Sequence, residues 1–146
     1  MQARTFVVDT KVVVAGLLTR DALSPTARVL DGMVDASFLF LLSTTLLAEY
    51  REVLLRPRIR SRHGLDADEI DSLLTEVVAN AIIREPDPSD EEAPSSQDQH
   101  LWDLLGTERG TVLITGDQSL LDNPPGGASV ISPGRFDRGL GLEDAG

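Results

Sequence analysis

The chain has 146 residues, of which 41% are hydrophobic and 25% charged, so it fits one globular domain and wholesale disorder is excluded. The absence of cysteine excludes disulfides and thiolate metal sites and fits a cytoplasmic location, and no apolar run approaches the roughly 20 residues of a membrane span. The net charge of −11 excludes nucleic-acid binding through the overall field, so an RNA-binding role would require a local basic patch or a bridging metal.

Along the chain, short apolar runs rich in β-branched residues alternate with segments of helical spacing. The apolar runs predict strands at residues 5–8, 38–42, 81–84, 111–115 and 128–131. The helical segments cover residues 12–18, 24–34, 43–56, 66–80 and a stretch from 96 to Gly110. Ser24 before Pro25, and capping boxes at Asp66 and Ser96, mark three helix starts. The polar residues 86–96 are predicted to form an exposed loop.

This alternation predicts a three-layer α/β fold with a parallel sheet and right-handed crossovers. We place the domain at residues 1–134 and interpret the Gly- and Asp-rich residues 135–146 as a flexible C-terminal tail. In sheets of this kind ligands bind outside the carboxyl ends of the strands. Chemistry is therefore expected at that edge.

Two acids follow predicted strands directly. Asp9 ends the first strand, and Asp117 lies two residues beyond the fourth, so both are expected at the carboxyl edge of the sheet. Each also has a plain structural interpretation, because Asp is a good cap for a following helix.

Two further acids lie on helices that start from the same edge. Glu49 lies three residues after Leu46, on or beside the buried stripe of its helix, or at the rim with its carboxylate in water. Asp98 occupies the first turn of its helix, where the helix dipole favours an acid whatever its function.

Four carboxylates that converge in this way repel one another, and some would take up protons unless a cation joined them. Oxygen-only ligands select hard cations such as Mg²⁺ or Mn²⁺, which can activate water and stabilise displacement at phosphorus. No cluster of His or Cys competes for this role, and we interpret His63 and His100 as isolated surface residues. The sequence therefore predicts a divalent metal site built from Asp9, Glu49, Asp98 and Asp117.

The segments around these acids resemble the four motifs of PIN-domain nucleases, in the same order from residue 5 to about residue 131. The segments are 7–18 (VVDTKVVVAGLL), 46–57 (LLAEYREVLLRP), 98–101 (DQHL) and 113–121 (LITGDQSLL). Within that family the chain resembles most the VapC-like toxins of toxin–antitoxin systems. The resemblance implies a Rossmann-like sheet with strand order 3-2-1-4-5, Mg²⁺- or Mn²⁺-dependent cleavage of single-stranded RNA, a cognate antitoxin protein and a homodimer.

Carried over residue by residue, the resemblance assigns catalytic and metal-ligand roles to the four acids. Thr115 matches a position whose hydroxyl helps to hold the site, and Thr10 and Lys11 are expected to support it. Two positions depart from the family pattern, because Lys11 stands where Asn is usual and Ser119 where another acid is common. We interpret the Lys11 ammonium either as a surface charge or as a group that partly replaces the metal and weakens nuclease activity.

Five arginines between residues 51 and 62 form the basic segment, which precedes an acidic stretch. Arg51, Arg56 and Arg58 are candidate contacts for RNA phosphates, although the segment could equally neutralise the acidic residues that follow it. The first functional hypothesis is thus a metal-dependent endoribonuclease, the toxin of a toxin–antitoxin pair. The alternative is a catalytically weak PIN-like module that binds RNA or protein. A phospho-receiver domain fits poorly, because the first strand ends in a single acid.

Overall fold

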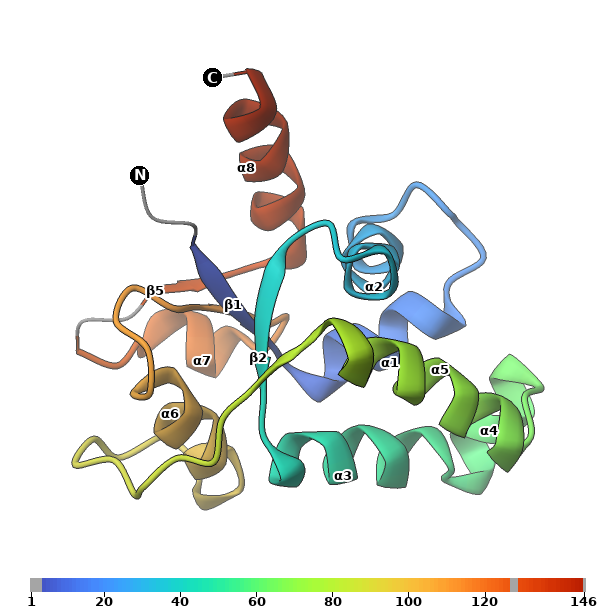
Figure 1. Ribbon diagram of the computed structural model, residues 1–146, viewed down its shortest axis with the longest axis horizontal. Coiled ribbons are helices and arrows are strands. Elements are labelled where there is room, and N and C mark those ends of the chain that lie inside the picture. Colours follow the sequence, from blue (N-terminus) through green and yellow to red (C-terminus); the bar gives the residue numbers. More distant parts are fainter. Residues whose placement is uncertain (1–3, 127–128, 146) are drawn as a thin grey trace.

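The computed structural model describes residues 4–126 and 129–145, with side chains described up to residue 139. Its strands form one parallel sheet in the order β3-β2-β1-β4-β5, flanked by helices (Figure 1). The strands are β1 (Thr5–Val8), β2 (Leu39–Leu42), β3 (Ile82–Ile83), β4 (Val112–Ile114) and β5 (Ser129–Ile131). The helices are α1 (Thr10–Leu18), α2 (Pro25–Asp35), α3 (Thr44–Leu54), α4 (Pro57–His63), α5 (Ala67–Asn80), α6 (Gln99–Leu105), α7 (Gln118–Asp122) and α8 (Pro133–Ala145), with a 3₁₀ turn η1 (Ser96–Asp98) before α6.

The sheet confirms the predicted α/β class and strand order. Strand β1 is central, with Phe6 in register with Phe40 of β2 and Val8 with Ile114 of β4. The side chains of β1 are buried, as the apolar run predicted for a strand covered on both faces. Its position places the first residue after it, Asp9, between the ends of two neighbouring strands.

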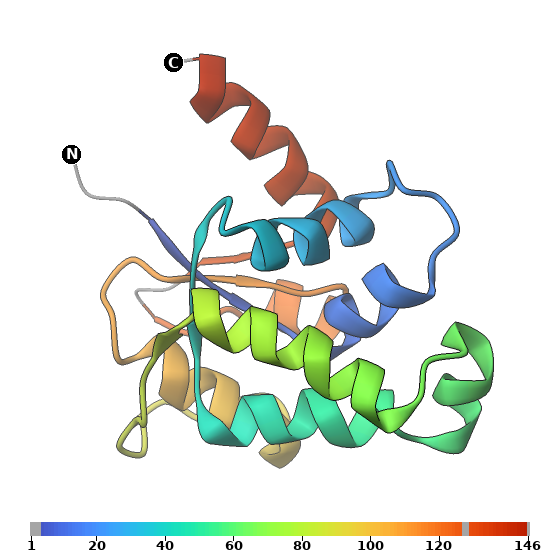
Figure 2. The same ribbon diagram turned by 45° about the vertical axis from the view of Figure 1, so that its right-hand side comes forward.

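Several helix starts lie where the sequence placed them. The Ser24 hydroxyl accepts a hydrogen bond from the Ala27 amide, with Pro25 in the first turn of α2. Asp66 and Glu69 form the predicted capping box at the start of α5. In Figure 2, α2, α5 and α3 lie side by side, and their apolar faces contribute to the core.

Near residues 56–57 and 96 the structure differs in detail from the sequence predictions. The predicted helix end before Pro57 is confirmed, because α3 ends at Leu54. The sequence did not predict helix α4, which Pro57 opens because proline is well suited to the first helical position. The predicted capping box at Ser96 is replaced by η1, which Ser95 caps through the Gln97 amide. The side chain of Gln99 instead binds the backbone of the preceding loop, where its amide donates to the Glu91 carbonyl oxygen at 2.9 Å.

The chain after β5 differs from the predicted flexible tail, because residues 133–145 form α8. Phe136 is buried against two other aromatic rings, with ring centroids 4.9 Å from Phe6 and 4.8 Å from Phe38. One buried phenylalanine tied to the core outweighs the poor helix propensity of the glycines around it. The predicted fifth strand begins at Ser129, and its first predicted residue, Ala128, lies outside the described residues.

Strands β1 and β4 end together at one edge, and the chain turns there into α1 and α7. This is the edge at which the sequence placed the acidic site. Within the described residues, no helix is both long and apolar enough to cross a membrane.

Candidate functional site

Asp9 lies at the centre of the carboxyl edge and is buried, with 6% of its surface exposed. Its amide donates to the Ile114 carbonyl oxygen at 3.0 Å, and its Oδ2 accepts the Thr115 hydroxyl at 2.7 Å. The side chain does not cap α1 through a hydrogen bond, so helix capping does not account for an acid here. Burial raises the pKa of Asp9 and the charge of Glu49 raises it further, against the lowering effects of Thr115 and Lys11.

Glu49 reaches the same site from α3, with about a third of its side chain exposed (35%). Its Oε1 accepts the hydroxyl of Thr10, the first residue of α1. Its Oε2 lies 2.8 Å from Nε2 of His100 on α6. Both oxygens are therefore engaged, and the carboxylate ties α3 to α1 and α6.

Asp98 stands at the junction of η1 and α6, half-buried and without a side-chain capping hydrogen bond. Burial raises its pKa, and the charges of Asp9, Asp117 and Glu49 raise it further. The four predicted acids thus act on one another electrostatically. That mutual repulsion is what a shared cation would relieve.

Asp117 does cap its helix, as the plain structural interpretation expected. Its Oδ1 accepts both the amide and the hydroxyl of Ser119 at 2.9 Å, and these hydrogen bonds lower its pKa. The Asp117 amide donates to the Thr115 hydroxyl oxygen at 3.1 Å. Thr115 is fully buried, and its hydroxyl connects Asp117 with Asp9.

Two residues of the site did not emerge from the sequence. Tyr50 is buried, and its hydroxyl donates a hydrogen bond of 2.5 Å to the Val8 carbonyl oxygen. Val8 is the residue immediately before Asp9. Burial and the charges of Asp9 and Glu49 raise its pKa, so the phenol stays protonated and keeps donating. The only feature of the sequence that pointed to Tyr50 was its position directly after Glu49.

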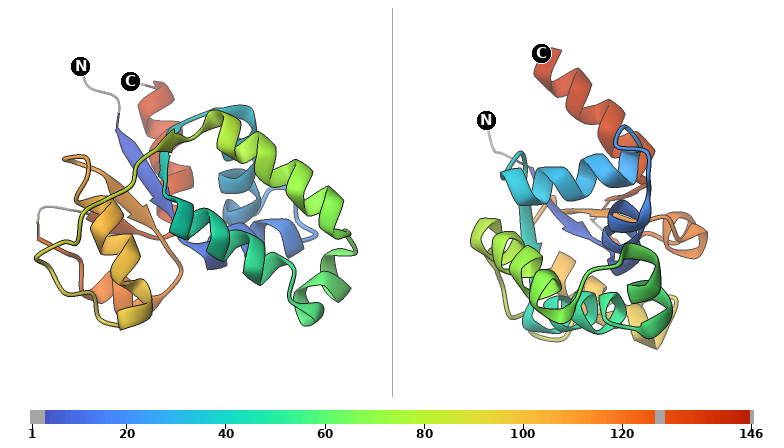
Figure 3. Two further views of the ribbon diagram at one scale, coloured as in Figure 1. Left: turned by 60° about the horizontal axis from the view of Figure 1, so that its bottom comes forward. Right: turned by 90° about the vertical axis from the view of Figure 1, so that its right-hand side faces the viewer.

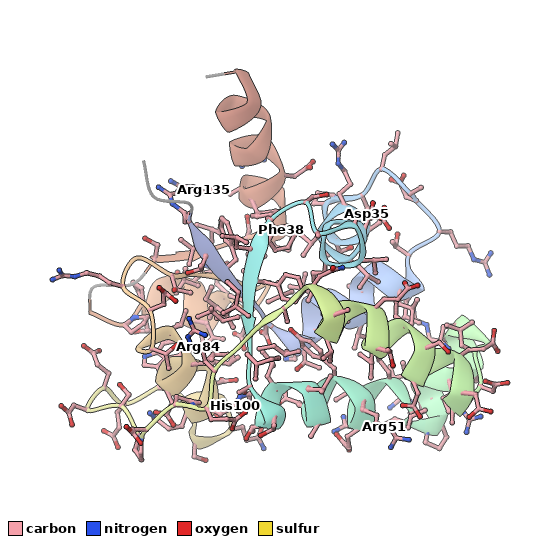
Figure 4. The ribbon with its side chains drawn as sticks, viewed as in Figure 1. Asp35, Phe38, Arg51, Arg84, His100 and Arg135 are labelled. Atoms are coloured by element: carbon pink, nitrogen blue, oxygen red, sulfur yellow. The ribbon has the colours of Figure 1, made fainter. Side chains whose placement is uncertain are left out.

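His100 is the second, and its interpretation as an isolated surface residue was wrong. It is mostly buried, with 19% of its side chain exposed, and lies beside α3 where its Nε2 meets Glu49 (Figure 4). Its Nδ1 is buried and has no hydrogen-bond partner within the described residues. The ring nitrogens of His63, by contrast, form their hydrogen bonds with backbone groups, the Leu54 carbonyl and the Leu65 amide.

Lys11 lies in the first turn of α1, next to Thr10, with its side chain exposed. Its positive charge lowers the pKa of both Asp9 and Asp117. Lys11 forms no direct ion pair among the residues that the structure describes, so it acts on the acids at longer range.

Comparisons with known proteins identify the family of the chain and agree with its fold. The family model described as PIN domain matches residues 5–119, which contain all four acids. The chain belongs to the PIN domain family. The solved structure of the RRP44 PIN domain from T. brucei shares the fold with a TM-score of 0.51 and 14% sequence identity, over 99% of this chain and 84% of that chain. No curated protein sequence matches the chain.

PIN domains are generally nucleases, and PIN nucleases generally use divalent metal ions. The donor chemistry of this PIN domain fits a hard cation, because the site offers carboxylate oxygens whose protonation and repulsion a metal would relieve. As the side chains stand, no set of three or more His, Cys, Asp or Glu residues in the described part is arranged to hold a metal ion. Thr10 and His100 each contact one oxygen of Glu49, so a metal would bind this carboxylate through the lone pairs that these contacts leave free.

The basic segment of this PIN domain divides into paired and unpaired arginines. Arg51 lies on α3 (Figure 4) and forms two hydrogen bonds with the carboxylate of Asp71, the closer at 2.7 Å. Arg56 pairs with Glu52 at 2.9 Å. RNA would have to displace these carboxylates, so Arg51 and Arg56 are weaker candidates than Arg58. Arg58 forms no ion pair in the part of the chain that the structure describes.

Proposed function

We propose that this PIN domain is a Mg²⁺- or Mn²⁺-dependent endoribonuclease that cleaves single-stranded RNA. The supporting observation is Asp9, a buried carboxylate held by Thr115, whose pKa is raised by burial and by the charge of Glu49. An ionised carboxylate buried at the end of a central strand lowers the stability of the fold unless a cation binds beside it.

In this proposal Asp9, Glu49, Asp98 and Asp117 would hold the metal. When bound, the metal supplies an activated water and neutralises charge on the phosphate. Thr115 orients Asp9, and Thr10 and His100 orient Glu49, in the way that outer hydrogen bonds orient metal ligands. Tyr50 holds the end of β1 in place beneath Asp9.

The test is incubation of the purified protein with end-labelled single-stranded RNA and Mn²⁺ or Mg²⁺. Internal cleavage products that disappear with EDTA and in the Asp9→Asn variant would support the proposal. Products of equal yield in wild type and variant would come from a contaminating nuclease and would refute it.

His100 offers a more local prediction about the same site. We expect His100→Ala to weaken Mn²⁺ binding about 10- to 100-fold, because Glu49 loses the partner that holds its Oε2. Isothermal titration calorimetry measures this directly. The matched control is His63→Ala, since the ring of His63 forms its hydrogen bonds with backbone groups and none with the four acids. Equal Mn²⁺ affinities in both variants would remove His100 from the site.

The second candidate function is a catalytically weak module that binds RNA or protein. The observation that favours it is Lys11, whose charge already acts on Asp9 and Asp117 as a metal would. In this case the ammonium partly replaces the metal. The chain then binds divalent ions weakly and cleaves RNA slowly.

Lys11→Asn separates the two functions. We expect it to tighten Mn²⁺ binding on the order of tenfold, because removing a nearby positive charge removes its repulsion of the ion. Lys11→Arg keeps the charge and should leave the Mn²⁺ affinity near that of the wild type. Tight wild-type binding that Lys11→Asn does not change would refute the replacement of the metal by Lys11.

We further propose that the protein is the VapC-like toxin of a toxin–antitoxin pair, acts in the cytoplasm as a homodimer and is neutralised by a cognate antitoxin protein. This assignment rests on the similarity of the motifs around the four acids. Induced expression in a bacterial host tests it. Growth arrest by the wild type but not by Asp9→Asn would support a toxin, and normal growth with active nuclease would refute it.

A further inference from the structure

A groove of about 550 Å³ lies between α1, α3 and α4. These three helices pack next to one another, and Figure 3 shows α4 beyond the end of α3. Apolar side chains from all three line the groove, among them Leu18 of α1, Val53 of α3 and Ile59 of α4. The polar part of the lining consists of two cations, Lys11 and Arg62, and two threonines, Thr19 and Thr26, and it contains no acid.

One end of this groove adjoins the acidic site. Lys11 follows Thr10 in the first turn of α1, and the Thr10 hydroxyl donates to Glu49 of that site. The groove therefore runs from Lys11, next to the acidic site, along α1 toward α4. In a chain with a net charge of −11, an acid-free and cationic surface directly beside the acids is unusual.

The second cation of the groove is available for an anion. Arg62 is exposed in the last turn of α4 and forms no ion pair with any carboxylate that the structure describes. Arg51 and Arg56, in contrast, have their guanidinium groups occupied by Asp71 and Glu52. An unpaired guanidinium gains more from a phosphate than one that must first leave a carboxylate.

We infer that this groove holds a nucleotide of the single-stranded RNA next to the scissile phosphate. The apolar walls cover a base or ribose, and Lys11 and Arg62 contact the flanking phosphates. Only an unpaired strand can turn a base into such a groove, because the bases of a duplex stay stacked. The inference rests on the proposed nuclease function and adds to it the path of the strand and the reason for single-strand preference.

The test is fluorescence anisotropy of labelled single-stranded RNA in EDTA, so that binding is measured without cleavage. We expect Arg62→Gln to weaken binding about fivefold and to reduce the slope of log affinity against log salt by roughly 0.7, the loss of one phosphate contact on a single strand. The matched control is Arg109→Gln, an exposed arginine before β4 at the opposite edge of the sheet. That variant should bind RNA like the wild type.

Unchanged binding in Arg62→Gln, or an equal loss in Arg109→Gln, would overturn the inference. Displacement of the RNA by polyglutamate at equal charge concentration would indicate a site for an acidic protein and would also overturn it. The two proposals fail separately: cleavage with unchanged binding in Arg62→Gln refutes only the groove, and Arg62-dependent binding without cleavage refutes only the nuclease.

Discussion

Replacing Asp9 with Asn is expected to reduce metal-dependent RNA cleavage by about a hundred- to a thousandfold. Asn keeps the shape of the side chain and an oxygen for the Thr115 hydroxyl, but it removes the charge that would hold the metal. Metal ions supply several kcal/mol of transition-state stabilisation, and roughly 1.4 kcal/mol corresponds to a tenfold change in rate. Single-turnover cleavage of labelled RNA in Mn²⁺ measures the effect.

The same variant should be more stable than the wild type in the absence of metal. Because burial raises the pKa of Asp9 above its ordinary value of 3.8, the protonated form is favoured in the folded chain. The stabilisation by the protonated form is fully present below the pKa that Asp9 has in the unfolded chain. It is lost as the pH rises through the higher pKa of the folded chain, so at pH 7 the ionised Asp9 carboxylate destabilises the fold. Thermal unfolding of both proteins in EDTA should show a higher Tm for Asp9→Asn at pH 7 and a shrinking difference on acidification.

A variant that loses activity through unfolding would show a lower Tm, and the activity loss would then say nothing about metal binding. Full activity in a folded Asp9→Asn variant would remove Asp9 from the catalytic machinery. A Tm difference between the two proteins that does not shrink on acidification would contradict the raised pKa of Asp9.

Phe136→Ala is expected to lower the free energy of unfolding by about 3–5 kcal/mol, the usual cost of deleting a buried aromatic ring. The Phe136 ring packs edge-on against two rings, with interplanar angles of 85° to Phe6 and 65° to Phe38. These contacts join α8 to the sheet. RNA cleavage by the folded fraction should not change, because Phe6 lies at the start of β1, away from the carboxyl edge. Urea unfolding followed by circular dichroism provides the measurement.

The control on the same helix is Arg135→Ala, an exposed residue at the start of α8 (Figure 4). Its free energy of unfolding should stay within about 0.5 kcal/mol of the wild-type value. Equal stability in Phe136→Ala and Arg135→Ala would contradict the contribution of α8 to the core. Such a result would support the sequence prediction that residues 135–146 form a flexible tail outside the domain.

Local sequence patterns were enough for most of the fold. The β-branched runs before Asp9 and Asp117 identify buried parallel strands, and the cap residues Ser24 and Asp66 mark helix starts, because these signals act over a few neighbouring residues. The same locality explains the failure at α8. The contact that stabilises it joins Phe136 to Phe6 across nearly the whole chain, and no short-range pattern reports such a pairing.

The acidic site shows the same division. By itself, the sequence placed two acids just after strands and two on helices that start at the same edge of a parallel sheet, since strand direction decides where the chain turns. Only the tertiary structure decided what each acid touches. The pairing of Glu49 with His100, 51 residues away, and the groove between Lys11 and Arg62 depend on how separate helices pack, which is a property of the assembled core.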